Sequence, residues 1–226
     1  MTLAITDLVK TFDQPGGGAL TVLDVPSFNI AAGEQVALIG QSGGGKTTLL
    51  HLIAGLLAPD SGSIKIDSIE LTKLSEEGRD RVRAASVGYV FQTFNLLPAF
   101  TAIENVRLGM TFGRRKLDPA RAKDLLDRVG LSDRANYKPS QLSVGQQQRV
   151  AIARALAGKP KILLADEPTA NVDPNSAETV LELIRQSCID EQIALLMVTH
   201  SMDVANKFDR VDKLDEINRA FTSAVA

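Results

Sequence analysis

The sequence has little of what marks a secreted, membrane-spanning or nucleic-acid-coating protein. One cysteine among 226 residues cannot form an internal disulfide, so nothing requires an oxidising compartment. No stretch approaches the roughly 20 apolar residues of a membrane-spanning helix, and the N-terminus lacks the pattern of a signal peptide. A net charge of −2 argues against coating of nucleic acid. We expect a cytoplasmic protein that reaches a membrane only through a partner.

What is present is typical of a globular protein. Apolar residues make up 44% and charged residues 23% of the chain, which suits one domain with a sizeable core and room for a subdomain. Cys188 is expected to be a small buried residue on a helix rather than a reactive thiol.

The apolar pattern changes along the chain and predicts an α/β fold. Residues 3–9 and 19–30 alternate apolar and polar positions around a break at Gly16–Gly18, which predicts antiparallel pairing. A turn cluster at residues 58–63 precedes a further strand at 63–67. Continuous apolar runs, typical of buried parallel strands, occupy residues 34–40, 87–92, 161–168 and 193–200.

The middle of the chain has a helical pattern. Residues 74–85 form a charged helix that Ser75 can cap. Residues 93–110 and 118–131 are expected as helices around an exposed apolar loop centred on Leu96, Leu97 and Pro98. The fold class is therefore α/β: a parallel-sheet core, an antiparallel β edge and a helical insertion.

The segment GQSGGGKT has the pattern of a phosphate-binding loop between a buried strand and an apolar helix. Its glycines let backbone N–H groups point at phosphates, and the helix that follows from about Lys46 adds its positive dipole end. A chance match occurs at about one position in ten thousand. The candidate phosphate-binding residues are Gly40, Gln41, Ser42, Gly43, Gly44, Gly45, Lys46, Thr47 and Thr48.

Polar residues at the ends of other apolar runs complete a nucleotide-hydrolysis site. Asp166 can hold Mg²⁺ with the hydroxyl of Thr47, and Glu167 can deprotonate an attacking water. Gln92 and His200 follow neighbouring strands, so they are expected at the same edge, where Gln92 can also reach the metal.

A second helix start at Ser143–Gly145 could also face a phosphate. One chain with a complete phosphate site hardly needs it for the same nucleotide, whereas a head-to-tail dimer does. ATP would then join two copies, and hydrolysis would release them.

Together these residues resemble the ATP-binding subunit of ABC transporters. The motifs, in the family's order, are Walker A at 40–48, Gln92, the signature LSVGQ at 142–146, Walker B at 162–168, a D-loop at 170–173 and the switch residue His200. The resemblance runs over about residues 1–211. It implies one ABC ATPase domain over residues 1–226, with a helical subdomain at about 93–158 inserted in its P-loop core. It also implies Glu167 and His200 as catalytic, Phe12 against adenine, and Ser143, Gly145, Gln146 and Asp173 at the opposite subunit's ATP.

Residues 87–106 resemble the branch of lipoprotein-release, macrolide-efflux, haem-export and cell-division ATPases. That implies a homodimer on the cytoplasmic face of the membrane, bound to a permease expected in two copies. The nucleotide is ATP with Mg²⁺, and neither nucleic acid nor cargo is contacted. Loop 94–100 is a candidate seat for the permease, although Leu96 and Leu97 could instead pack inside.

Three departures from the family pattern stand out. Val144 replaces the usual glycine of the signature, where it could crowd the γ-phosphate. Phe12 replaces a commoner tyrosine and keeps the stacking surface. Residues 210–226 lack the glycine turn of a last hairpin, so the C-terminus is expected to be shorter or to contact a partner differently.

The main hypothesis is an ATP-hydrolysing motor of a membrane exporter, with haem or another amphipathic cargo preferred. The alternative is a signalling ATPase that controls a membrane partner in cell-wall remodelling without transport. A soluble repair or translation ATPase is disfavoured because no long coiled coil or second ATPase domain is present. An inactive scaffold is disfavoured because Lys46, Asp166, Glu167 and His200 are all present.

Overall fold

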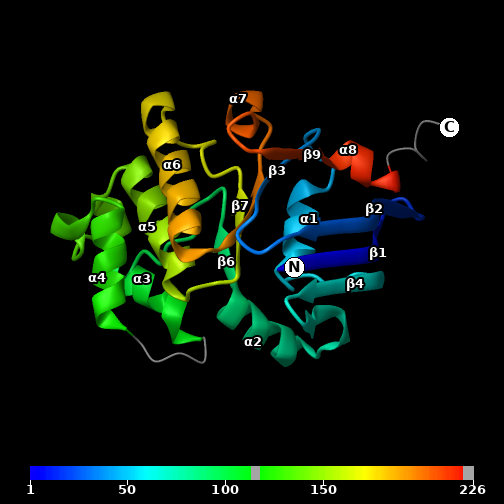
Figure 1. Cartoon of the computed structure of the whole chain (residues 1–226), viewed down its shortest axis with the longest axis horizontal. Coiled ribbons are helices and arrows are strands. Elements are labelled where there is room, and N and C mark those ends of the chain that lie inside the picture. Colours follow the sequence, from blue (N-terminus) through cyan, green and yellow to red (C-terminus); the bar gives the residue numbers. More distant parts are fainter. Residues whose placement is uncertain (113–117, 221–226) are drawn as a thin grey trace.

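The computed structural model describes residues 1–112 and 118–220, which form two β-sheets with helices around them (Figure 1). The larger sheet has five strands in the order β6-β7-β8-β3-β9, and every neighbouring pair is parallel. Its strands are β3 (Gln35–Ile39), β6 (Val87–Val90), β7 (Ile162–Asp166), β8 (Ala194–Val198) and β9 (Arg210–Lys213). This sheet is the predicted α/β core.

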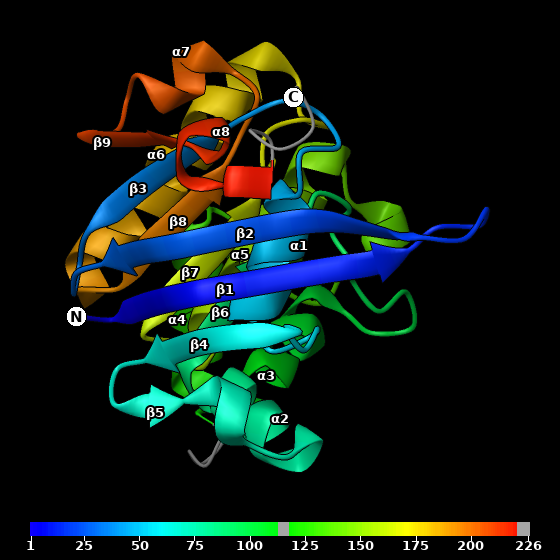
Figure 2. The same cartoon turned by 90° about the vertical axis from the view of Figure 1, so that its right-hand side faces the viewer.

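The second sheet is antiparallel, with the order β2-β1-β4-β5 (Figure 2). Its strands are β1 (Leu3–Asp13), β2 (Ala19–Ile30), β4 (Ser61–Ile66) and β5 (Ile69–Glu70). Gly17 and Gly18 have positive φ angles in the turn between β1 and β2. The glycine break therefore connects two antiparallel strands, as predicted.

Helices cover both faces of the parallel sheet (Figure 1). Helix α1 (Lys46–Ile53) lies between the two sheets and buries Leu49, Leu50, Leu52 and Ile53. The other helices are α2 (Glu76–Ser86), α3 (Ala102–Thr111), α4 (Pro119–Arg128), α5 (Val144–Ala157), α6 (Pro174–Glu191), α7 (Met202–Ala205) and α8 (Leu214–Ile217). No helix of the described residues has the length and apolar character needed to cross a membrane.

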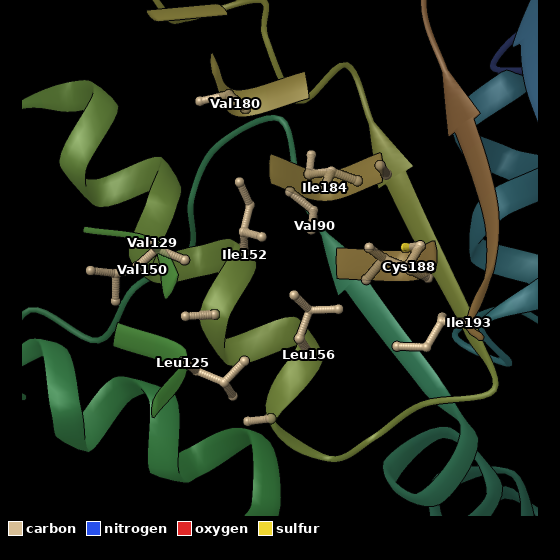
Figure 3. Packing of buried hydrophobic residues seen from close by; sticks show 14 of the residues in the cluster. Val90, Leu125, Val129, Val150, Ile152, Leu156, Val180, Ile184, Cys188 and Ile193 are labelled. Atoms are coloured by element: carbon tan, nitrogen blue, oxygen red, sulfur yellow. The ribbon is translucent and has the colours of Figure 1, made fainter. Parts of the chain in front are cut away.

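Alternation along the central strand β7 divides the core into two clusters. Leu163 and Ala165 pack with α3, α4, α5 and α6, whereas Ile162 and Leu164 pack toward α1 and the antiparallel sheet. Figure 3 shows the first cluster, in which Ile152 and Leu156 of α5 meet Ile184 and Cys188 of α6. Helix α5 is therefore packed firmly against the sheet's helical face.

Local signals placed several element boundaries correctly. Helix α1 begins at Lys46, and Ser75 caps α2 by accepting a bond from Gly78 N–H at 3.3 Å. Cys188 is buried on α6 as expected, and burial, with a contribution from Glu191, raises its pKa to about 12.

Two expectations about element boundaries were wrong. The strand expected from residue 63 begins at Ser61, because Gly62, at φ 93°, allows β1 to approach so closely that a Cβ would lie 2.3 Å from the Asp7 carbonyl. The helix expected over 93–110 begins only at Ala102, after a capping box between Thr101 and Glu104. At the C-terminal end, residues 210–217 form β9, parallel to β3, and α8. The expectation of a shorter tail or a different partner contact stays a prediction, and residues 221–226 lie outside the described part.

Candidate active site

The phosphate-binding loop connects the carboxyl end of β3 to the start of α1. Gly43 and Gly45 adopt left-handed φ angles of 77° and 90°, which are unfavourable for residues that have a β-carbon. A Cβ on Gly45 would also lie 2.9 Å from Val22 of the antiparallel sheet. The loop conformation thus depends on glycine for its dihedrals and for its close contact with β2.

Lys46 lies across this loop. Its side chain is buried, and its Nζ donates to the carbonyl oxygens of Gly40 and Gln41, both at 2.8 Å. Helix α1 has no side-chain cap at Gly45. The loop therefore presents a lysine ammonium and uncapped helix N–H groups together, which is the donor set of an anion site.

Asp166 ends β7 with a largely buried carboxylate. Burial raises its pKa, the Thr47 hydroxyl lowers it, and the nearby Glu167 charge raises it again. Among the described residues no cation lies within ion-pair distance of Asp166. A buried carboxylate beside a hydroxyl, without an ion pair, fits a hard divalent cation such as Mg²⁺.

Glu167 and His200 are paired at the same edge of the sheet. Nδ1 of His200 lies 2.8 Å from Oε1 of Glu167. The backbone N–H of Glu167 donates to the Val198 carbonyl, and its φ of 46° turns the chain out of the strand. The side chain of Glu167 is 12% exposed and that of His200 is 70% exposed. The pair therefore combines a shielded carboxylate with an imidazole that is open to solvent.

The remaining predicted residues lie at the rim. Gln92 follows β6 and is exposed. Its backbone carbonyl accepts a hydrogen bond from Nδ2 of Asn171 at 2.9 Å. Phe12, near the end of β1, is 39% exposed, and Nζ of Lys10 lies 5.3 Å from its ring centre. Its ring is thus available for stacking.

The second helix start is a separate surface. Ser143 caps α5 by accepting from Gln146 N–H, and the Gln146 side chain accepts in return from Ser143 N–H. Asp173 caps α6 beside it by accepting from Ser176 N–H. A groove of about 400 Å³ is lined by Ser143, Val144, Gly145, Arg149, Asp173, Ser176, Thr179 and Val180. Among the described residues no hydrogen bond joins the start of α5 to the phosphate loop.

Sequence reasoning missed residues that connect these parts. Gln148 is fully buried on α5, and its Nε2 donates to the carbonyl of Pro168, next to Glu167, at 2.8 Å. Asn171 joins the D-loop segment to the carbonyl of Gln92. Arg154 binds the backbone carbonyls of Phe94 and Asn95. No local pattern marks such contacts, because their partners lie 20 or more positions away.

A parallel sheet with this loop, this lysine and two carboxylates at one edge defines a P-loop ATPase. Residues 23–170 match the ABC transporter family. A LolD 2 lipoprotein-releasing system ATP-binding protein of Caulobacter vibrioides is 43% identical over 95% of this chain and 94% of its own. A LolD of Pseudomonas fluorescens is 42% identical over 95% of both chains.

Solved structures agree with these matches. The dimeric ATP-binding cassette MJ0796, in a post-hydrolysis state with ADP and Pi, has a TM-score of 0.85 and 37% identity over 93% of both chains. This chain belongs to the ABC transporter family, as an ATP-binding subunit of the lipoprotein-release branch. It is an ATPase whose hydrolysis is coupled to transport.

Proposed function

We propose that this chain is the motor of a membrane exporter and works as a head-to-tail homodimer around ATP. One observation carries the proposal: the chain has a phosphate loop with a buried lysine and, apart from it, a second helix start at Ser143 that only its own residues cap. In the dimer, Ser143, Gly145, Gln146 and Asp173 of one subunit would complete the ATP site of the other. The dimeric MJ0796 cassettes support this arrangement.

Each site residue has a proposed role in the ATP-bound dimer. Phe12 stacks on adenine, residues 40–48 hold the phosphates, and Lys46 exchanges its carbonyl partners for phosphate oxygens. Thr47, Gln92 and Asp166 would hold Mg²⁺, which would supply positive charge to offset the negative charge of the phosphates. These are the parts that phosphoryl transfer requires.

Hydrolysis converts ATP and water into ADP and phosphate. Glu167 takes a proton from the attacking water, whose oxygen bonds to the γ-phosphorus as the bond to ADP breaks. His200, bonded to Glu167 at 2.8 Å, holds that carboxylate in place and contacts the γ-phosphate. Loss of the γ-phosphate removes the contact between subunits, and the dimer opens.

The loop 94–100 is the proposed seat of the membrane partner, and residues 93–158 the helical subdomain that moves with it. Leu97 is 45% and Phe100 37% exposed, whereas Leu96 packs against the core. Asn105 fixes this loop: its Nδ2 donates to the carbonyls of Leu97, Phe100 and Thr101, and its Oδ1 accepts from Leu97 N–H. A rigid apolar platform of this kind suits a partner helix.

The cargo is proposed as amphipathic and is not contacted by this chain. Relatives named as lipoprotein-releasing ATPases favour a lipid-bearing protein over haem. The subunit would sit on the cytoplasmic face, with a permease expected in two copies. A signalling ATPase in cell-wall remodelling is the second candidate, because the same motor would serve it.

The first test uses Glu167→Gln with ATP, in which binding without hydrolysis should trap the dimer. Its mass is measured by light scattering, with Glu216→Gln, an exposed carboxylate, as the matched control. The trapped dimer is then recovered from solubilised native membranes.

Recovery of a permease with few spans supports the exporter, and its loss in Leu97→Asp supports the docking loop. Recovery of a wall-remodelling protein supports the signalling candidate. A monomer with ATP, or recovery of ribosomes or DNA alone, contradicts the proposal.

A further inference from the structure

Arg154, near the end of α5, holds a backbone segment rather than a carboxylate. Its Nη1 donates to the carbonyl of Asn95 at 2.6 Å and its Nη2 to the carbonyl of Phe94 at 2.7 Å. Among the described residues no acid lies within ion-pair distance of this guanidinium, and burial lowers its pKa. Partial burial of this charge carries a desolvation penalty, which its hydrogen bonds to the two carbonyls offset.

The segment that Arg154 holds begins directly after Gln92. Asn95 has a φ of 48°, so the chain turns sharply where the two carbonyls point at α5. On its other side the carbonyl of Gln92 accepts from Asn171. Residues 92–95 are therefore held from two directions, by α5 and by the turn before α6.

Both of those supports lead to the surface that faces the opposite subunit in the proposed dimer. Helix α5 starts at the Ser143 cap, and Asn171 lies two residues before the Asp173 cap of α6. The 14-residue helix α5 is packed along its length by buried residues, among them Val150, Ile152 and Leu156, so it moves as one body.

We propose that Arg154 is a positioning residue that couples the Gln92 segment to α5. When the γ-phosphate pulls the Gln92 side chain toward it, the Arg154 guanidinium transmits the movement to α5. The N-terminus of α5 at Ser143 is thereby positioned over the ATP of the opposite subunit. The proposal rests on the head-to-tail dimer proposed above. A planar guanidinium holds two successive carbonyls through two separate nitrogens in a fixed geometry, whereas a lysine ammonium has a single donor nitrogen on a flexible stem and would hold this pair less firmly.

The chain offers a matched control in Arg121 of α4. Its guanidinium also donates to two successive carbonyls of α5, those of Leu156 at 2.7 Å and Ala157 at 3.0 Å. That contact lies at the end of α5 away from Ser143 and does not touch the Gln92 segment. Arg121 also forms an ion pair with Glu191 of α6 at 2.7 Å, so Arg121→Lys weakens the support of α5 by its neighbours while leaving the proposed link intact.

The test measures the ATP concentration that gives half-maximal dimer in full-length Glu167→Gln. Adding Arg154→Lys should raise this concentration by about tenfold, a common size of coupling between sites. Adding Arg121→Lys should leave it within about twofold, because the link is retained. A fluorescent ADP analogue, which lacks the γ-phosphate, should bind all three variants equally. If the Arg154→Lys variant does not fold, Arg154→Gln replaces it, because glutamine keeps a single donor nitrogen.

The outcomes separate the two proposals. If Glu167→Gln alone forms no dimer with ATP, the head-to-tail dimer is wrong and the Arg154 proposal falls with it. If Glu167→Gln dimerises but Arg154→Lys leaves its ATP dependence unchanged, only the Arg154 proposal is overturned. An equal shift for Arg121→Lys, or weaker binding of the ADP analogue by Arg154→Lys, also overturns it, because the effect would then be general.

Discussion

The two helix starts of this chain that can face phosphate differ in how they are built. At α1 the N-cap is Gly45, no side chain caps the helix, and the lysine that follows is buried. At α5 the N-cap Ser143 and Gln146 cap each other, and Val144 between them is 48% exposed. The start of α1 is partly buried by its own chain, whereas the start of α5 is capped by its own residues and exposed to solvent.

This difference indicates that the two helix starts contribute differently to a site shared between two subunits. An uncapped helix start beside a buried lysine has no side-chain partner for its N–H groups, so it gains most from a bound phosphate. A self-capped, exposed start is stable in the monomer and can join a site only when a second molecule approaches. The start of α1 should therefore govern nucleotide binding and chemistry, and the start of α5 should govern association.

The largest expected effect is on the rate of ATP hydrolysis and separates it from ATP binding at the phosphate-loop site. Glu167→Gln keeps the size of the side chain and removes the base, so the rate of phosphate release should fall about 10²–10⁴-fold. Binding of a fluorescent ATP analogue to the variant should persist. A Glu167→Gln rate close to wild type would show that another group accepts the proton, whereas exposed Glu216→Gln should leave the rate unchanged.

The second-largest expected effect concerns the exposed start of α5. Val144→Glu places a carboxylate where the opposite γ-phosphate should arrive, and ATP hydrolysis should fall by about a hundredfold, because like charges at an interface cost several kcal/mol. The unfolding temperature of the monomer should hardly change, since Val144 is half exposed.

Val144→Thr has a similar shape without the charge and serves as the control. It should hydrolyse ATP at nearly the wild-type rate. Full activity in Val144→Glu would place the γ-phosphate away from α5 and would contradict the head-to-tail arrangement.

A smaller effect compares two helix caps of matched geometry. Ser143 and Ser75 each accept from a backbone N–H at 3.3 Å. Replacing either by alanine should cost about 1 kcal/mol of unfolding free energy, or roughly 2–4 °C in melting temperature. Only Ser143→Ala should also reduce ATP-driven dimerisation, measured in the Glu167→Gln background. Equal dimerisation by both variants would make Ser143 a structural cap alone.

The sequence predicted those parts of the fold that a local pattern determines. The glycine-lysine loop fixed the start of α1 at Lys46, and the apolar run ending in Asp166 marked a central strand. Ser61 was missed as a strand residue because its place depends on Gly62 meeting Asp7, more than 50 positions away. A pattern in the immediate neighbourhood cannot report such a contact.

The same limit applies to the site. Residues with a distinctive chemical role at a strand end, such as Glu167 and His200, were predicted, and the structure brings them into contact. Gln148 and Arg154 were not, because a glutamine and an arginine on a helix look like surface residues until their carbonyl partners are known. The roles assigned to the opposite subunit's residues stay predictions, since they concern a contact between two chains.

The smallest expected effect is on thermal stability and comes from the buried carboxylate of Asp166. Burial raises the pKa of Asp166 in the folded chain, so the unfolded chain loses this proton at a lower pH than the folded chain does. Ionisation of Asp166 therefore favours the unfolded state. The stability contributed by the protonated carboxyl is fully present below its ordinary pKa of 3.8 and is lost as pH rises through the raised folded value. Asp166→Asn, which cannot ionise, should therefore unfold at a higher temperature than wild type without nucleotide or metal.

That advantage should grow as the pH rises from 3.8 through the raised folded pKa and then level off, which thermal unfolding monitored by circular dichroism can follow. Exposed Asp133→Asn should give an offset without this trend, because its carboxylate is 73% exposed. Addition of ATP with Mg²⁺ should reverse the order, since the ion stabilises the ionised Asp166 and has less to bind in the variant. An Asp166→Asn protein that is less stable than wild type at every pH would mean that the carboxylate is already compensated within the chain.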